Sequence, residues 1–203
     1  MLERRPFPIC NILGVNIAAV DMSRTVGYIQ KYIKELSGFY ICISNVHTTV
    51  MSYENEKYCA IQNGAVLALP DGKPLSIVCK RQGFPETQRV TGPDLMGEIF
   101  AISGENGYRH YFYGSTEDTI RTLRKQLEES YPGIEIAGCY APPFRPLTKE
   151  EDAEVTKQIN EAEADFIWVG LGAPKQEQWM YAHQGRVRGG MIGVGGGFDY
   201  FAG

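Results

Sequence analysis

FYICIS, at Phe39–Ser44, is a continuous run of aromatic, β-branched and other apolar residues. It predicts a buried strand. A helical pattern follows at about Thr48–Ile61, and a second apolar run, Ala65–Leu69, ends in the turn sequence Pro70-Asp71-Gly72. Strand, helix and strand in this order favour a parallel pair joined by helical segments.

The same alternation extends along the rest of the chain. It predicts an extended stretch at about residues 11–20 and a helix that Asp21 caps. Further strands are expected at residues 109–113, 134–138, 166–169 and 190–194. Further helices are expected around residues 75–81, after Thr91-Gly92-Pro93, after Gly114-Ser115, from Thr148 to about Ala162 and from Pro174 to about His183. The predicted fold class is α/β: a single domain, residues 1–203, with a mainly parallel, Rossmann-like sheet covered by helices on both faces.

Composition narrows the classes of function. The 203 residues include 20 Lys and Arg against 24 Asp and Glu, a net charge of −4 that argues against nucleic acid as a partner. Five cysteines without C-x-x-C spacing indicate buried thiols in a reducing compartment. Because no apolar run approaches about 18 residues and no secretory leader is evident, the sequence predicts a cytoplasmic protein.

Six turns follow the expected strands, and all are rich in Gly, Pro or small polar residues. In open α/β sheets, ligands bind beyond the carboxyl ends of the strands. Each turn alone is explained by chain reversal, but six at one edge indicate a binding site. They begin at Ser44, Pro70, Gly114, Gly138, Gly170 and Gly195.

Asp71 is the candidate catalytic base. Its carboxylate follows a strand at a sharp turn, where it either caps the next helix or accepts a proton from a hydroxyl nucleophile. Asn45 offers donors and acceptors to a sugar or base. His47 is either a second base or a structural histidine near a helix start. Tyr140 opens a stiff loop that either stacks on a base or sugar or packs the sheet edge.

Phosphate recognition has several candidates. Arg89 precedes a helix start and either pairs with phosphate or is solvated. Gln176 is expected in the first turn of the helix after Pro174, where it either faces a ligand or is simply part of a helix start. The Gly193–Gly197 run fails as G-x-G-x-x-G, and no P-loop or D-x-D metal motif occurs, so oxidoreductase, NTPase and metal-site interpretations lose support.

Together these strings resemble the bacterial WecG/TagA/CpsF glycosyltransferases. The resemblance covers nearly the whole chain, and its specificity lies in the ordered set rather than in any one string. The matching segments are Ser44–His47, Pro70–Gly72, Arg89–Met96, Tyr140–Phe144, Val169–Glu177 and Gly193–Asp199.

The resemblance implies the fold called GT-E and an inverting transfer of a sugar, of N-acetylmannosamine type or a related hexose. The donor would be a UDP-sugar and the acceptor a polyprenyl-diphosphate-linked sugar, in cell-surface polysaccharide or teichoic acid synthesis. No cofactor and no metal are expected. Asp71 would be the base, with Ser44 as a catalytic helper, although members often carry Thr two residues before the Asn, where this chain has Ile43. The expected substrate-binding residues are Asn45, His47, Arg89, Thr91, Asp94, Gly114, Tyr140, Gly170, Gly172, Lys175, Gln176, Gly195 and Gly196.

Family members usually continue beyond the Gly-Gly-Gly-Phe-Asp segment into a C-terminal appendage that reaches the membrane. This sequence ends at Gly203, so we expect the appendage to be absent, with weaker activity and membrane affinity. Apolar surface left uncovered would favour a homo-oligomer. The expected location is cytoplasmic, peripheral at the inner face of the cell membrane. Two alternatives stay open: a non-catalytic UDP-sugar-binding module, and another nucleotide-dependent α/β enzyme.

Overall fold

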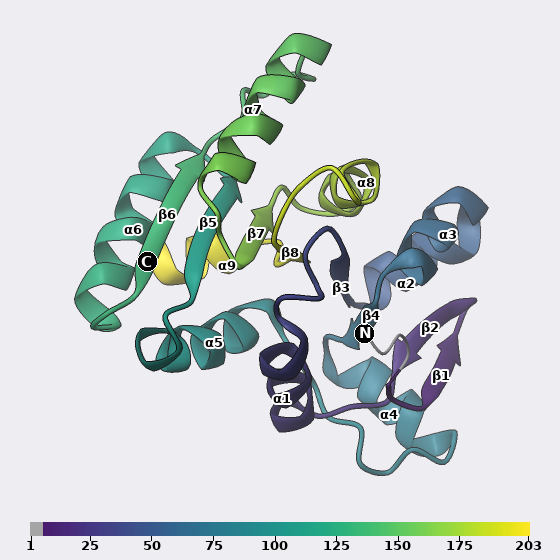
Figure 1. Ribbon diagram of the computed structural model, residues 1–203. Helices are drawn as coiled ribbons and strands as arrows, with labels where there is room; N and C mark the ends of the chain where they lie inside the picture. Colours follow the sequence, from purple (N-terminus) through teal and green to yellow (C-terminus); the bar gives the residue numbers. More distant parts are fainter. Residues whose placement is uncertain (1–5) are drawn as a thin grey trace.

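A computed structural model describes residues 6–203 and confirms the predicted single α/β domain with a parallel sheet. Six parallel strands form the main sheet in the order β4-β3-β8-β7-β5-β6, and two antiparallel strands form a separate hairpin, β1-β2 (Figure 1). The strands are β1 Ile9–Ile12, β2 Val15–Ala18, β3 Tyr40–Ser44, β4 Leu67–Pro70, β5 Arg109–Gly114, β6 Glu135–Tyr140, β7 Phe166–Gly170 and β8 Gly190–Gly193.

Helices connect the strands of the main sheet. They are α1 Met22–Tyr32, α2 Val46–Glu54, α3 Glu56–Gly64, α4 Lys73–Arg81, α5 Gly92–Asn106, α6 Glu117–Ser130, α7 Lys149–Glu161, α8 Lys175–Ala182 and α9 Gly197–Ala202. Side-chain oxygens cap several starts as the sequence predicts, with Asp21 accepting from Arg24 N–H and Thr148 forming a capping box with Glu151.

Residues 11–20 do not form one extended stretch. They belong to the β1-β2 hairpin, which turns at Leu13 and Gly14, both with positive φ. The hairpin packs beside β4, and Ala68 of that strand joins an apolar cluster with α4 (Figure 1). The prediction failed because an exposed turn with only one glycine interrupts an otherwise strand-like pattern.

The single helix expected at Thr48–Ile61 is two helices. Asn55 leaves the helical region (φ −139°, ψ 103°), ends α2 and accepts from the Tyr58 N–H to start α3. Asn favours this role because its side chain replaces a missing backbone partner. The short helix α9, which follows the last strand, was not predicted at all.

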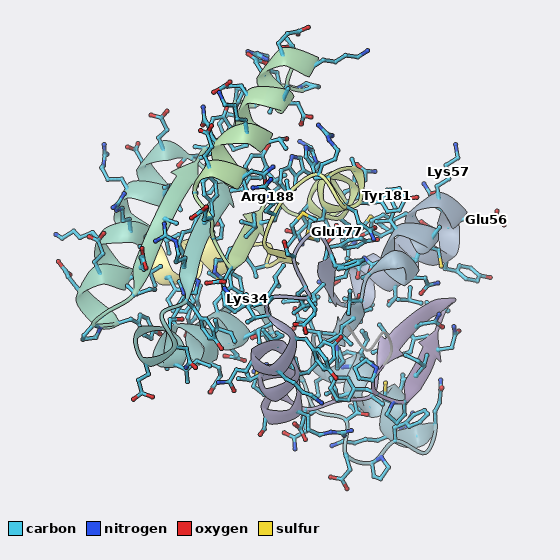
Figure 2. All side chains as sticks on the ribbon, viewed as in Figure 1. Lys34, Glu56, Lys57, Glu177, Tyr181 and Arg188 are labelled. Carbon is cyan, nitrogen blue, oxygen red and sulfur yellow. The ribbon has the colours of Figure 1, made fainter. Side chains whose placement is uncertain are left out.

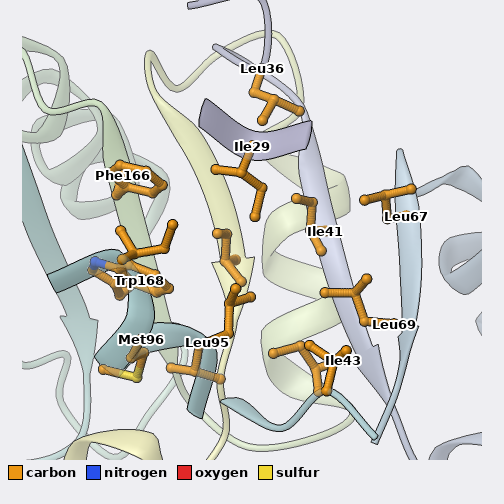
Figure 3. Close-up of a cluster of buried hydrophobic side chains, with 14 of the residues drawn as sticks. Ile29, Leu36, Ile41, Ile43, Leu67, Leu69, Leu95, Met96, Phe166 and Trp168 are labelled. Atoms are coloured by element: carbon orange, nitrogen blue, oxygen red, sulfur yellow. The ribbon is translucent and has the colours of Figure 1, made fainter. Parts of the chain in front are cut away.

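Apolar side chains cover both faces of the sheet. Strand β3 alternates, with Ile41 and Ile43 on the face that α1, α5 and α9 cover, and Tyr40 and Cys42 on the face of α7 and α8. Figure 3 shows the first of these clusters, in which Trp168 lies between Phe166 and Met96. This two-sided burial fixes the positions of the strand ends and thus of any site built on them.

His110 is buried in this core as a neutral imidazole. Its Nδ1 accepts from Trp168 Nε1 at 3.0 Å, and its Nε2 lies 2.9 Å from Ser103 Oγ, which itself donates to the Ile99 carbonyl. Since the Ser103 hydroxyl donates its one proton to Ile99, Nε2 is the donor in the second bond. Burial lowers the pKa of His110 to about 3, with the charge of Asp165 opposing.

We therefore expect stability to fall with acidity below pH 6.5. The unfolded chain binds a proton at this histidine near pH 6.5, whereas the folded chain does so only near pH 3, so the contribution is complete above 6.5 and is lost toward 3. Well inside that window the slope is about 1.4 kcal/mol per pH unit. The direct check is the His110 Cε1–H chemical shift, which should stay constant from pH 8 to about pH 5. A titration near pH 6.5 would contradict this assignment.

Candidate active site

The carboxyl ends of all six parallel strands lie at one edge of the main sheet. The turns that leave this edge carry the polar and glycine residues that the sequence singled out. Neighbours across the sheet are Ser44 with Pro70, Gly114 with Gly170, and Val169 with Gly193, so their turns adjoin in pairs. The edge is therefore a continuous row of strand-end turns.

Asp71 is the first residue after β4 and is half-buried. Its N–H donates to the Ser44 carbonyl at 2.8 Å, which ties the turn to β3. Burial raises the pKa of the Asp71 carboxyl, while the charge of Arg89 and the Gly72 N–H lower it and Asp94 raises it, with a net rise. A carboxylate whose proton affinity is raised by its surroundings is suited to general-base work.

Arg89, Thr91 and Asp94 lie beside Asp71 at the start of α5. Val90 N–H donates to the Pro70 carbonyl at 2.8 Å, so this segment is fastened to the end of β4. Thr91 Oγ1 accepts from the Asp94 N–H, and the Asp94 carboxylate lies 3.5 Å from the exposed guanidinium of Arg89. The Arg89 guanidinium therefore lies near the carboxylates of both Asp71 and Asp94 and is exposed to solvent.

Gly92 brings this cluster against the end of β8. A Cβ at Gly92 would lie 2.8 Å from the Val194 carbonyl oxygen, so only glycine permits the contact. The start of α5 therefore adjoins the Gly-rich turn at Gly195 and Gly196, in which Gly195 is half-buried and Gly196 exposed. Asp71 and the Gly-rich turn thus lie on the same part of the edge.

Asn45 caps α2 in a reciprocal box with Thr48, its Oδ1 accepting from the Thr48 N–H at 3.0 Å. His47 lies exposed in the first turn of α2. Ser44 is fully buried, and its hydroxyl donates to Gln62 Oε1 at 2.6 Å. The three adjacent residues therefore differ: Asn45 and His47 reach the surface, whereas Ser44 is committed to a partner inside the protein.

The Ser44–Gln62 bond continues into the interior. Gln62 Nε2 donates to Tyr58 Oη at 2.9 Å, and Tyr58 donates to Glu177 Oε2 at 3.1 Å. Tyr58 and Gln62 are one helical turn apart on α3 and both are buried. This first chain of hydrogen bonds therefore runs from the end of β3 to α8.

A second chain reaches Glu177 from the Gly-rich turn. Gly195 N–H donates to Gln176 Oε1 at 3.0 Å, and Gln176 Nε2 donates to Glu177 Oε1 at 2.8 Å. The Gln176 amide lies over Gly193, where a Cβ would come within 3.1 Å of Nε2. Glu177, labelled on α8 in Figure 2, is fully buried, and burial raises its pKa against the hydrogen bonds that lower it.

A groove of about 640 Å³ opens further along the same edge, beyond β5 and β7. Its volume is within the range of small-molecule sites. Lys149, Lys175 and Arg145 give it positive charge, and the Arg145 guanidinium is held by both carboxylate oxygens of Glu151. The lining is Tyr113, Ser115, Pro142, Pro143, Phe144, Arg145, Pro146, Leu147, Thr148, Lys149, Asp152, Gly170, Leu171, Lys175 and Trp179.

Stacked aromatic rings form one wall of the groove. Trp179 stacks on Tyr113 with centroids 4.3 Å apart and on His183 at 4.1 Å, and the Tyr140 ring stacks with Tyr113 at 5.8 Å. His183 Nε2 lies 2.8 Å from the Asp152 carboxylate. Tyr113 and His183 are buried, so the half-buried Trp179 is the ring of this column that the groove leaves most accessible.

The structure thus divides the predicted residues into two groups and an intervening turn. One group surrounds Asp71 and includes Ser44, Asn45, Arg89, Thr91 and Asp94. The other belongs to the groove: Gly170 and Lys175 line it, and Tyr140 supports it. Gln176 and Gly195 lie between. Gly114, with φ +134°, is buried at the close approach of β5 and β7. The Gly172 carbonyl accepts from the Gln176 N–H at 2.9 Å, so Gly172 belongs with the intervening residues, and His47 is exposed in the first turn of α2.

Sequence reasoning missed several residues of this edge. Glu177, Gln62 and Tyr58 are buried polar groups, and Trp179 and Tyr113 line the groove. One sequence signal existed: Tyr58 and Gln62 share a helical face in a segment next to two buried strands. The burial of Glu177 was not visible in the sequence, because it depends on how α8 packs against α3.

Three further observations concern residues 6–203. No helix in this range is long and apolar enough to cross a membrane. In the same range no three His, Cys, Asp or Glu side chains gather into a group that would hold a metal ion. All five cysteines are free thiols, of which Cys10, Cys42 and Cys79 are buried.

Comparison with known proteins identifies what the chain is similar to. The model of the glycosyl transferase WecG/TagA/CpsF family matches residues 10–203. This range includes both groups of residues on the sheet edge and the turn between them.

Curated relatives include proteins of Staphylococcus aureus. The proteins of strains NCTC 8325 / PS 47 and MRSA252 are each 28% identical to this chain over 204 residues, covering 99% of this chain and 78% of the relative. Both carry the name N-acetylglucosaminyldiphosphoundecaprenol N-acetyl-beta-D-mannosaminyltransferase.

Proposed function

The chain belongs to the WecG/TagA/CpsF family of glycosyltransferases, and from this membership we propose that it moves a sugar from a UDP-sugar to a polyprenyl-diphosphate-linked sugar, with Asp71 as the base. The observation that carries the proposal is the position of Asp71. It is a half-buried carboxylate of raised pKa at the carboxyl edge of a parallel sheet, in the same row of turns as a cationic, aromatic groove.

In the proposed reaction, a hydroxyl oxygen of the acceptor attacks the anomeric carbon of the donor. The new carbon–oxygen bond forms as the bond from that carbon to UDP breaks, on the opposite face, so the configuration inverts. Asp71 takes the hydroxyl proton, and UDP departs with the bonding electrons. The raised pKa of Asp71 supports this role because a higher proton affinity makes the carboxylate a stronger base.

The groove is the proposed site of the donor nucleotide. The half-buried Trp179, backed by Tyr113, suits a base or ribose, and Lys149 and Lys175 suit the diphosphate. Charge grows on the diphosphate as UDP departs, so nearby cations and backbone N–H groups would stabilise the transition state. Arg89, next to Asp71, is a further candidate for this role.

We base the proposed acceptor on the name that the relatives carry. That name specifies an N-acetylglucosaminyl-diphospho-undecaprenol acceptor and the transfer of an N-acetylmannosaminyl group. We propose the same acceptor class here and an N-acetylmannosamine-type donor. Because that acceptor is lipid-linked, the enzyme would work at a membrane surface.

The experiment is a panel of UDP-sugars incubated with a soluble polyprenyl-diphosphate-sugar analogue. UDP release that requires the acceptor supports the transferase. UDP binding without release from any donor, in this chain and in an extended version, would favour the non-catalytic binding module instead.

Metal independence is a separate expectation. Since lysine side chains, rather than a cluster of carboxylates, border the groove, we expect excess EDTA to leave the initial rate of UDP release unchanged. The measurement compares rates with EDTA and with EDTA plus excess Mg²⁺ or Mn²⁺. A rate that EDTA abolishes and either metal restores would contradict this part of the proposal.

A further inference from the structure

Glu177 is the point at which two chains of hydrogen bonds end. Every bond in the first chain points toward it, from Ser44 to Gln62, to Tyr58 and to Glu177 Oε2. Every bond in the second points toward it as well, from the Gly195 N–H to Gln176 and to Oε1. Both Glu177 oxygens accept, so this carboxyl group fixes the direction of both chains.

The two chains reach different sides of the site. Ser44, at the end of the first, is the residue whose carbonyl accepts from the Asp71 N–H. Gly195, at the end of the second, lies in the turn that follows β8, beside the start of α5. Glu177 is 0% exposed, so no substrate touches it.

We propose that Glu177 is a positioning residue, which holds the base side of the site and the Gly-rich turn in one fixed geometry through these two chains. The inference deepens the proposed transferase function and rests on it. A buried carboxylate is costly without full hydrogen bonding. Here both carboxylate oxygens have a side-chain donor, which accounts for the presence of this carboxyl group in the protein interior.

The variant Glu177→Gln tests whether the direction of the two hydrogen-bond chains matters, because it leaves the volume of the side chain nearly unchanged. An amide has one acceptor oxygen and one donor nitrogen, so it cannot accept from both chains. The Gly195 chain cannot reverse, because a backbone N–H only donates. The Ser44 chain can reverse, since two hydroxyls and one amide can each turn. We expect E177Q to keep the Gly195 chain and to reverse the Ser44 chain. After this reversal the Gln62 amide donates to the Ser44 oxygen, and the Ser44 hydroxyl no longer donates to Gln62.

Tyr58→Phe cuts the Ser44 chain while leaving the Glu177 side chain in place. We expect E177Q and Y58F to lower kcat about 10- to 100-fold, because in both variants position 177 no longer fixes the hydrogen bonding of Ser44, whose carbonyl accepts from the Asp71 N–H, and to change the KM for the UDP-sugar less than threefold. Glu177→Ala removes the acceptor of both chains and should lower kcat and raise the donor KM together. The matched control is Glu129→Gln on exposed α6, with unchanged kinetics expected.

Each rate is measured well below the variant's own Tm, so that reduced stability alone would leave kcat unchanged. If the wild type turns over and folded E177Q and Y58F match it in kcat, Glu177 has no positioning role, while the proposed function stands. If the wild type is inactive with every donor, the proposed function fails. The inference is then read from NMR hydrogen exchange of the Gly195 amide. Exchange at least tenfold faster in E177A than in E129Q supports it, and equal exchange overturns it.

Discussion

Replacing Asp71 by Asn should abolish most turnover. The amide cannot accept the proton of the attacking hydroxyl, and a positioned base contributes about 10²–10⁴-fold to rate. We therefore expect kcat for UDP release to fall by about that factor. The affinity for UDP, measured by calorimetry, should change little, because the turn itself is held by the Asp71 N–H and the Pro70 carbonyl rather than by the carboxylate.

Folding should survive the same substitution. Because burial raises the pKa of Asp71, its ionised form gains nothing from folding, and a neutral side chain of the same shape is tolerated. The control is Asp118→Asn, at an exposed position in the first turn of α6, which should retain full turnover.

Activity of the wild type should fall as pH drops through the Asp71 pKa, which lies above 3.8. Full activity in the Asp71→Asn variant would remove Asp71 from the mechanism.

Gly114→Ala should be among the most destabilising single-methyl changes in the protein. A Cβ there would lie 2.4 Å from the Gly170 carbonyl oxygen, and φ is +134°, which L-residues rarely adopt. Overpacking costs about 1–3 kcal/mol and the strained backbone about as much again. We expect the free energy of unfolding in urea to fall by about 2–6 kcal/mol, together with distortion of the groove at Ser115 and Gly170.

Gly107→Ala separates the two causes. Gly107 also has positive φ, +63°, but nothing lies within 4 Å of its added Cβ. Its cost should be about 1–2 kcal/mol, from conformation alone. If both variants lose the same free energy of unfolding, the contact between β5 and β7 at Gly114 is less close than the structure indicates.

The sequence predicted the elements that have strong periodic patterns. The buried strand at Tyr40–Ser44 and the capped helix at Lys149–Glu161 follow from local composition and capping chemistry. Residues 11–20 and the break at Asn55 were mispredicted because single turn residues decided them. Chain reversal at one residue leaves little trace in a hydrophobic pattern.

In the site, too, some features could be predicted from the sequence and others could not. A parallel sheet brings its carboxyl ends to one edge, so the order of strands and turns along the chain is enough to group strand-end residues such as Asp71 and Gly195. The partners of Ser44 could not be predicted, since Gln62 and Glu177 lie 18 residues and more than a hundred residues away in the sequence. Their burial depends on the packing of α3 against α8, which no local pattern encodes.

The most direct test of the central claim is a crystal structure with a UDP-sugar and a soluble acceptor analogue bound together. We predict an acceptor hydroxyl within about 2.6–3.2 Å of the Asp71 carboxylate, with the anomeric carbon of the donor beyond it and UDP on the far side. A complex in which the Asp71 carboxylate contacts only Arg89 and the Gly72 N–H, with the nucleotide bound elsewhere, would contradict the account.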